Sequence, residues 1–382
     1  MIRTMTGMAD QGLRAIVRMR PLPRLLTWTV TFRCNARCSM CDSWRKDASD
    51  ELDTDAALGM VRSLPRSLTA VRLTGGEPFV RTDFGRLVRG LEEHLEPEFV
   101  HITTNGFLTS SILAFLEERS SRRASALKIL VSLDGMADTH DRIRGRSNAF
   151  ERAIATIRAL AERRWATGLD LAVNQTVVDQ TGIEEYDELH GLLRRLDVPH
   201  HVVVAYAQSA TYSTTPGVDL SPKHPGEFKT VVELERSAVE RFLDTLEADL
   251  AELPLANRLA KAYYYRGLRS RLLEGRSSPN PPCVALSSHL RIFPDGMVPV
   301  CQFNSKPVGN IARDGFDAVW NGERIRSERD WVRACPGCWA ECEVLPSALL
   351  GGDLFRKTSM AEVFKPKRVP GAELSFLSRG PG

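Results

Sequence analysis

The sequence lacks any long apolar run: no uninterrupted stretch in its 382 residues approaches the 18 or more that a membrane-spanning helix needs. It also lacks the apolar core of a signal peptide near its N-terminus. Neither sign of charge is in large excess, because 51 lysines and arginines are interspersed with 48 aspartates and glutamates. We therefore expect a cytoplasmic protein with no transmembrane segment and no nucleic-acid partner. A basic cluster at Arg119, Arg122 and Arg123 is the one feature that would favour RNA, and such clusters are most often solvated loops.

The eight cysteines fall into two odd-numbered groups, which in a reducing compartment is typical of metal ligands rather than disulfides. The first group is Cys34, Cys38 and Cys41, and the second is Cys283, Cys301, Cys335, Cys338 and Cys342.

The first group lies in the stretch TFRCNARCSMCDSW, residues 31–44, with the spacing C-x3-C-x2-C. Thiolates select zinc, Cu(I) or an iron–sulfur cluster, and three of them leave a tetrahedral ion or a four-iron cube one ligand short. On spacing alone, a zinc site or three buried, inert thiols remain open as alternatives.

Strand-like and helix-like stretches alternate after residue 24. Strands are expected at 25–32, 69–73, 99–104, 127–133, 169–178 and 200–206, and helices at 55–64, 84–95, 109–119, 148–164 and 183–196. This alternation indicates an α/β fold with a parallel sheet built by right-handed crossovers. In such folds, ligands gather at the carboxyl ends of the strands.

Unusual residues follow several of these strands, at the edge where ligands gather. Gly75, Gly76 and Glu77 follow the second strand, Asn105 follows the third, and Asp134 follows the fourth. Turn chemistry explains each of them singly, since Gly, Asn and Asp are common turn residues. Their joint placement at successive strand ends favours a ligand site.

The cysteine loop after a strand, the GGEP motif and the SLDG strand end together resemble the radical S-adenosylmethionine (SAM) superfamily, over residues 25–206. The resemblance implies a partial (β/α)6 barrel. It also implies that Cys34, Cys38 and Cys41 are the catalytic cysteines, which hold a four-iron four-sulfur cluster and leave its fourth iron to SAM.

By the same resemblance, the backbone at Gly75, Gly76 and Glu77 meets the amino group of SAM. Ser132 and Asp134 lie near the SAM carboxylate and ribose, and Arg144 pairs with the carboxylate. Two more polar side chains, expected to contact the ribose or adenine, are Asn105 and Asn174.

The second cysteine group resembles the auxiliary-cluster extension of radical SAM enzymes, called SPASM in its seven-cysteine form and Twitch in its shorter form. Five cysteines are two short of the two-cluster pattern, so the resemblance implies one auxiliary four-iron four-sulfur cluster, in a small α+β domain. We expect Cys283, Cys301 and two of Cys335, Cys338 and Cys342 as ligands. The C-x2-C pair is preferred, with Cys342 as the spare or substitute. A zinc ribbon is the alternative on spacing alone.

The domain boundaries that follow are an N-terminal arm at 1–24, the core barrel at 25–206, a loop and helical bridging segment at 207–282, the auxiliary-cluster domain at 283–350, and a flexible tail at 351–382. Tyr206, Gln208 and Tyr212 are candidate substrate contacts, because the long Ser/Thr/Pro-rich segment leaves the active side of the barrel. Residues 229–274 are expected to be helical, with at least one of Tyr263, Tyr264 and Tyr265 exposed or lining a pocket. Residues 290–301 are expected to form a small hairpin that turns at Pro294-Asp295-Gly296.

The resemblance implies an oxidoreductase that takes one electron from an external flavodoxin or ferredoxin, cleaves SAM and abstracts hydrogen from its substrate. Only about 25 residues precede the first strand, which we interpret as too few for a fused leader-peptide-binding domain. This favours a small molecule or biosynthetic intermediate over the alternative, maturation of a ribosomally made peptide with a separate binding partner. A third hypothesis, of another class, is a non-enzymatic zinc or iron–sulfur scaffold or sensor.

Overall fold

The computed structural model describes residues 21–120, 125–206 and 230–358. Its centre is a seven-stranded sheet in the order β6-β5-β4-β3-β2-β1-β7, with every neighbouring pair parallel. The strands are β1 Leu25–Thr29, β2 Ala70–Thr74, β3 Phe99–Thr104, β4 Ala126–Ser132, β5 Asp170–Val177, β6 His200–Val204 and β7 His289–Ile292. A separate antiparallel pair consists of β8 Met297–Pro299 and β9 Pro307–Asn310.

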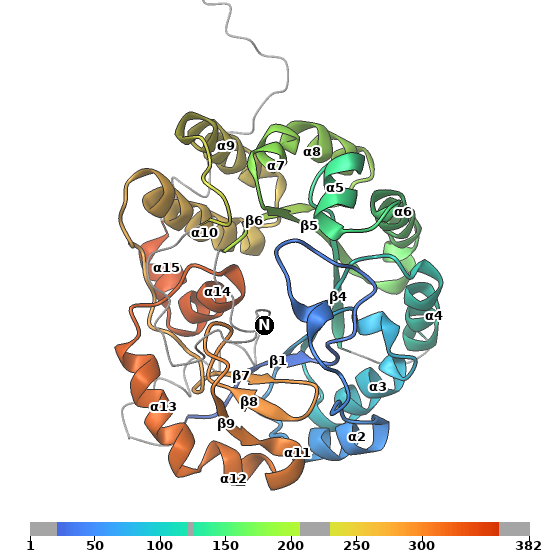
Figure 1. Cartoon of the computed structure of the whole chain (residues 1–382), viewed down its shortest axis with the longest axis vertical. Coiled ribbons are helices and arrows are strands. Elements are labelled where there is room, and N and C mark those ends of the chain that lie inside the picture. Colours follow the sequence, from blue (N-terminus) through green and yellow to red (C-terminus); the bar gives the residue numbers. More distant parts are fainter. Residues whose placement is uncertain (1–20, 121–124, 207–229, 359–382) are drawn as a thin grey trace, which may run out of the picture.

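Helices follow the strands and surround the sheet (Figure 1). Those of the first part of the chain are α2 Thr54–Ser63, α3 Phe84–Leu95, α4 Thr109–Ser120, α5 Ala137–Arg144, α6 Ala149–Thr167, α7 Gln180–Glu184 and α8 Tyr186–Arg195. Those of the second part are α9 Arg236–Asp249, α10 Leu255–Leu273, α11 Ile311–Asp314, α12 Phe316–Trp320, α13 Glu323–Ala334, α14 Glu341–Leu350 and α15 Asp353–Lys357. Short 3-10 helices are η1 Ser43–Arg45, η2 Pro78–Val80 and η3 Leu250–Glu252. The α/β fold with a barrel-like parallel sheet is thus confirmed.

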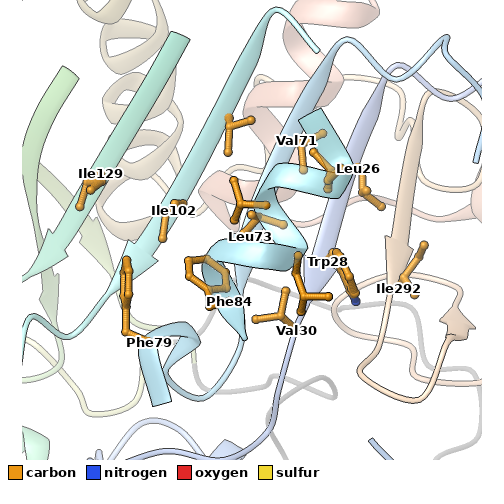
Figure 2. Close-up of a cluster of buried hydrophobic side chains, with 14 of the residues drawn as sticks. Leu26, Trp28, Val30, Val71, Leu73, Phe79, Phe84, Ile102, Ile129 and Ile292 are labelled. Atoms are coloured by element: carbon orange, nitrogen blue, oxygen red, sulfur yellow. The ribbon is translucent and has the colours of Figure 1, made fainter. Parts of the chain in front are cut away.

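The outer face of the sheet packs against the helices through an apolar core. Figure 2 shows Leu73, Ile102 and Ile129 of neighbouring strands beside Phe84 of α3. In β2 and β3, residues of this face alternate with partly exposed residues of the opposite face, because successive side chains of a strand point to opposite sides. The inner face therefore keeps accessible surface.

The seventh strand was not expected from the sequence. Residues 290–301 do turn at Pro294-Asp295-Gly296, where the Phe293 amide donates to the Met297 carbonyl at 2.8 Å. However, β7 pairs in parallel with β1, and β8 pairs with β9, so the expected two-stranded hairpin is wrong. β7 thereby extends the main sheet, whereas β8, which leads to Cys301, belongs to the separate pair.

The open side of the barrel is closed by α10 and α14. Figure 1 shows α14 inside the ring of outer helices, beside β7. Lys261 of α10 donates to the Val202 carbonyl of β6 at 3.2 Å and pairs with Glu341 of α14 at 2.7 Å. On the other side, Arg72 Nη1 of β2 donates to the Cys342 carbonyl at 3.0 Å. The C-terminal part is therefore built into the barrel wall.

Two further expectations are wrong in part. None of Tyr263, Tyr264 and Tyr265 is exposed, because α10 is covered by neighbours on several sides, among them α9 and the Trp339 ring. The expected tail begins with a helix, α15, whose Leu354 is buried. Residues 1–20 of the arm, Gln208, Tyr212 and the tail from residue 359 lie outside the described residues.

Within the described ranges, no helix is long and apolar enough to cross a membrane.

Candidate active site

The loop that carries the first cysteines begins where β1 ends and is held there by Glu51. Thr31 Oγ1 and the Phe32 amide donate to this carboxylate at 2.8 and 2.5 Å. The Val30 amide donates to the Thr74 carbonyl at 2.8 Å, which keeps the loop beside the end of β2. Glu51 was not identified from the sequence, because a carboxylate 17 residues after Cys34 has no local pattern that points back to the loop.

The two glycines of the GGEP motif pack directly on the cysteine loop. A Cβ atom at Gly75 would lie 2.3 Å from the Thr31 carbonyl oxygen, and one at Gly76 would lie 2.2 Å from the Arg33 carbonyl oxygen. The Gly76 amide also donates to the Thr31 carbonyl at 2.7 Å. The close backbone approach expected at this motif is thus made, in this structure, to the chain's own loop.

Cys34, Cys38 and Cys41 are free and half-buried on this loop. The Ala36 amide donates to Cys34 Sγ at 3.4 Å, and Arg144 Nη1 donates to Cys38 Sγ at 3.5 Å. Burial, together with the negative charge of neighbouring thiolates, raises the pKa of Cys34 to about 12 and that of Cys41 to about 11. Three thiolates here therefore require a strongly positive centre among them.

Arg144, expected to bind the SAM carboxylate, is paired with another of the expected SAM contacts. Its Nε lies 2.7 Å from Asp134 Oδ2, and both side chains are buried. Asp134 Oδ1 also accepts from the Thr176 amide at 3.0 Å, which links the ends of β4 and β5. The His140 ring accepts from the Asp134 amide at 2.9 Å. These contacts place Arg144 between the strand ends and Cys38.

Glu77 lies fully inside the site and bridges two strand ends. Its carboxylate accepts from Thr104 Oγ1 and the Asn105 amide, each at 2.7 Å. Burial raises the pKa of Glu77 to about 7, although these hydrogen bonds lower it. Asn105 Nδ2 in turn donates to Asn35 Oδ1 at 2.7 Å, next to Cys34.

Ser132 and Asn174 are direct neighbours across β4 and β5. Ser132 is buried, whereas Asn174 is half-buried and donates to Thr176 Oγ1 at 3.3 Å. The structure thus brings the expected SAM contacts of β2 to β5 to one end of the sheet, around the cysteine loop.

The donor set of Cys34, Cys38 and Cys41 consists of thiols, and thiolates are the ligands that hold iron–sulfur clusters. In the part of the chain that the structure describes, no three His, Cys, Asp or Glu side chains converge closely enough to ligate one metal ion.

The second cysteine group is assembled from three segments around Glu343. Burial is the main cause that raises the thiol pKa values of Cys283, Cys301 and Cys338, and these three are close enough for their charges to interact. The charge of Cys335 also reaches Cys283. These four are the ligands preferred from the sequence.

Cys342 has different neighbours. Its Sγ contacts Gln302 Oε1, and its thiol pKa is raised to about 11 by burial and by Glu343 but lowered by Arg291 and Arg72. The surroundings of Cys342 thus differ from those of the other four cysteines.

A buried carboxylate beside these cysteines is fixed by two basic residues. Arg291 Nη2 donates to Glu343 Oε1 at 2.6 Å, and His289 Nδ1 lies 3.3 Å from Glu343 Oε2. Burial alone would raise the pKa of Glu343, but Arg291 and His289 bring it down to about 2. Sequence reasoning missed this set, because its members belong to β7 and α14 and meet only in the fold.

Of the three candidate substrate contacts, only Tyr206 lies within the described residues. Its ring packs on Phe303 with the centroids 4.8 Å apart, and its pKa is raised by burial and by the charges of Cys338 and Cys335. Arg119, the one described member of the basic cluster, pairs with Glu92 at 2.6 Å, so it gives no support to an RNA site.

Two sequence families match the chain. The radical SAM superfamily pattern matches residues 28–193, and the SPASM iron–sulfur cluster-binding domain matches residues 283–342.

Similar proteins include the AdoMet-dependent heme synthase of Oleidesulfovibrio alaskensis, 30% identical over 92% of this chain and 90% of its own length. The sporulation killing factor maturation protein SkfB of Bacillus subtilis is 27% identical over 86% of this chain and 72% of its own length. Among solved structures, Streptococcus suis SuiB bound to its precursor peptide SuiA aligns over 83% of this chain and 68% of its own. The TM-score is 0.58 and the sequence identity is 15%. The last likeness shows the fold alone.

Proposed function

Because this chain belongs to the radical SAM superfamily and carries a SPASM domain, we propose that it is an oxidoreductase that removes hydrogen from a small biosynthetic intermediate. Its cofactors are a four-iron four-sulfur cluster, SAM and an auxiliary iron–sulfur cluster. When bound together and given one electron, the first cluster and SAM supply methionine and a 5'-deoxyadenosyl radical, which takes a hydrogen atom from the substrate.

The observation that carries this proposal is the convergence of the strand ends on the cysteine loop. Cys34, Cys38 and Cys41 would hold the first cluster. Arg144, 3.5 Å from Cys38 Sγ, offsets thiolate charge there, and its ion pair with Asp134 keeps the guanidinium in place. Glu77 fixes the ends of β2 and β3 through buried hydrogen bonds.

The wall of the barrel shields the reaction. A carbon radical abstracts hydrogen from whatever lies within reach, so the site must exclude water and orient one substrate carbon. The contacts of Lys261 with Glu341 and Val202 hold α10 and α14 on the open side of the sheet. These helices thereby keep the substrate space enclosed.

We assign the auxiliary cluster to Cys283, Cys301, Cys335 and Cys338, with Cys342 outside the ligand set. A cluster held there would supply an acceptor for one electron from the substrate radical, so that the substrate loses a hydrogen atom, an electron and, to complete the oxidation, a proton. The first electron comes from an external flavodoxin or ferredoxin.

The substrate class is supported by the Oleidesulfovibrio alaskensis relative, an AdoMet-dependent heme synthase that aligns along 92% of this chain. Peptide maturation is the second candidate, because SkfB also aligns along most of this chain and is a maturation protein. The two differ in what must enter the barrel: a compact molecule or an extended peptide.

The test begins with anaerobic purification and reconstitution with iron and sulfide, followed by iron counting and an assay for 5'-deoxyadenosine with SAM and dithionite. The comparison is a Cys34→Ala/Cys38→Ala/Cys41→Ala variant. We expect about eight irons and product for the native chain, and about four irons and no product for the variant. A native chain that leaves SAM intact under these conditions would overturn the proposal.

A further inference from the structure

A row of polar residues crosses the inner face of the sheet below the active site. Its members are in register on six neighbouring strands: Arg291 of β7, Thr27 of β1, Arg72 of β2, His101 of β3, Lys128 of β4 and Asp170 of β5. Because the flanking residues on each strand point to the outer core, this row faces the interior of the barrel. Lys261 of α10, itself buried, adds a further cation from the side that the sheet leaves open.

Of the four cations described in this region, three are paired with a carboxylate and one, Arg72, is not. Lys128 pairs with Asp170 at 3.2 Å, and Lys261 pairs with Glu341 at 2.7 Å. Arg291 is likewise held by Glu343. Among the residues that the structure describes, Arg72 has no carboxylate within ion-pair distance, and its Nη1 donates to the Cys342 carbonyl, a neutral acceptor.

Two imidazoles have an unused nitrogen: His101, the register neighbour of Arg72, and His201 of β6. The Nε2 atoms of His101 and His201 are buried and have no hydrogen-bond partner in the described part of the chain. Burial lowers the pKa of both rings well below the usual value, and the cations Arg72 and Lys128 lower that of His101 further. A neutral imidazole still carries one N–H group, which can donate to an anion without adding charge.

The interior beside these groups has accessible surface. Arg72 and His101 are half-buried, although the residues on either side of them in β2 and β3 are fully buried. The next inward residues toward the cysteine loop, Thr74 and Thr103, are half-buried as well. Accessible surface therefore continues along the inner face from Arg72 to the active end of the sheet.

We propose that Arg72 and His101 form a subsite that binds one carboxylate of the substrate inside the barrel. A single uncompensated cation suits a singly charged carboxylate better than a doubly charged phosphate group. Arg72 lies three residues before Gly75, roughly 10 Å along β2, so the carboxylate would anchor the substrate at a distance from its reacting carbon. This inference rests on the proposed function and narrows its substrate class to carboxylic acids.

The subsite is tested by ligand binding, without turnover. The probe is 4-(trifluoromethyl)benzoate, compared with 4-(trifluoromethyl)benzamide, which has a similar shape but no charge. Fluorine NMR relaxation gives the affinity of each probe for the full reconstituted chain. We expect the benzoate to bind, the benzamide to bind more weakly, and Arg72→Gln to weaken benzoate binding about tenfold.

Two more variants keep the test decisive. His101→Leu removes one donor without changing the charge, so it should weaken benzoate binding less than Arg72→Gln does. Arg86→Gln, which removes an exposed guanidinium outside the barrel, should leave the affinity unchanged. Thermal unfolding of each variant reports whether it is folded. If Arg72→Gln does not fold, the benzoate affinity of His101→Leu alone tests the subsite.

Equal affinity for benzoate and benzamide, or for the native chain and both barrel variants, would overturn the subsite. Inorganic phosphate that displaces benzoate at equal concentration would also count against a carboxylate subsite. The 5'-deoxyadenosine assay on the native chain, from the same preparation, tests the proposed function separately, so either idea can fail while the other stands.

Discussion

Arg144 Nε lies 2.7 Å from Asp134 Oδ2 inside the site, and the same guanidinium donates to Cys38 Sγ. From the sequence, Arg144 and Asp134 were each expected to contact SAM, whereas the fold pairs them with each other. Helix α5, which ends at Arg144, was not expected either; it brings this residue back to the cysteine loop. The pair therefore joins the end of β4 to the loop that carries the cluster ligands.

Asp134→Asn should destabilise the protein by about 3 kcal/mol or more, because it leaves the buried guanidinium of Arg144 without its counter-charge. Urea unfolding of the anaerobically purified protein measures this loss. The matched control is Asp55→Asn, which breaks the exposed pair with Arg86 and should cost less than about 1 kcal/mol. Equal costs for the two substitutions would contradict the importance of the buried pair.

Gly76→Ala should remove the first cluster and spare the auxiliary one. Its methyl group would lie 2.2 Å from the Arg33 carbonyl oxygen, so the cysteine loop must move. After reconstitution we expect about four irons instead of about eight, with no 5'-deoxyadenosine formed. Gly59→Ala in α2 is the control, since its methyl group meets only the end of the Arg62 side chain at 3.7 Å. Full iron content in Gly76→Ala would show that the loop tolerates the shift.

Cys338→Ser and Cys342→Ser should differ in their effect on the auxiliary cluster. The charges of Cys283 and Cys301 act on Cys338, whereas Arg291 and Arg72 are the basic neighbours of Cys342. In the background of the Cys34/Cys38/Cys41 triple alanine variant, which isolates the auxiliary cluster, we expect Cys338→Ser to lose its iron and Cys342→Ser to keep it. Iron analysis and the electron paramagnetic resonance spectrum of the reduced protein decide this, and the reverse pattern would exchange the two roles.

His200 should make the protein less stable in mild acid. Burial is the main cause that lowers the pKa of His200 well below 6.5, and the charges of His190 and Lys261 lower it further. The His200 ring of the folded protein therefore stays neutral in mild acid. Below pH 6.5 the unfolded chain binds a proton that the folded chain does not, and stability falls by up to about 1.4 kcal/mol per pH unit for this group.

His200→Phe, which keeps a ring stacked on Tyr186, should therefore reduce this loss. Urea unfolding of both proteins between pH 8.5 and pH 5 gives the dependence of stability on pH, and the two slopes should coincide above about pH 7.5, where His200 is neutral in both the folded and the unfolded state. Parallel slopes below pH 6.5 would mean that other groups account for the acid sensitivity.

Local patterns identified the outer layers of this fold well. The expected helix at 84–95 and the expected strand at 99–104 coincide with α3 and β3. Their boundaries follow from hydrophobic periodicity, and the apolar positions point to one shared core. The family motifs could also be recognised from the sequence, because the three thiols and the strand-end glycines each lie close together along the chain.

The sequence by itself therefore determined the parallel α/β fold, the cysteine loop and the edge of the sheet at which a ligand would bind. Only the tertiary structure decided that β7 joins β1, that Asp134 pairs with Arg144, and that Arg72 meets the Cys342 carbonyl. Residues 72 and 342 are separated by 270 positions. No periodicity links such positions, because burial, charge compensation and backbone hydrogen bonding select these partners together once the chain is compact.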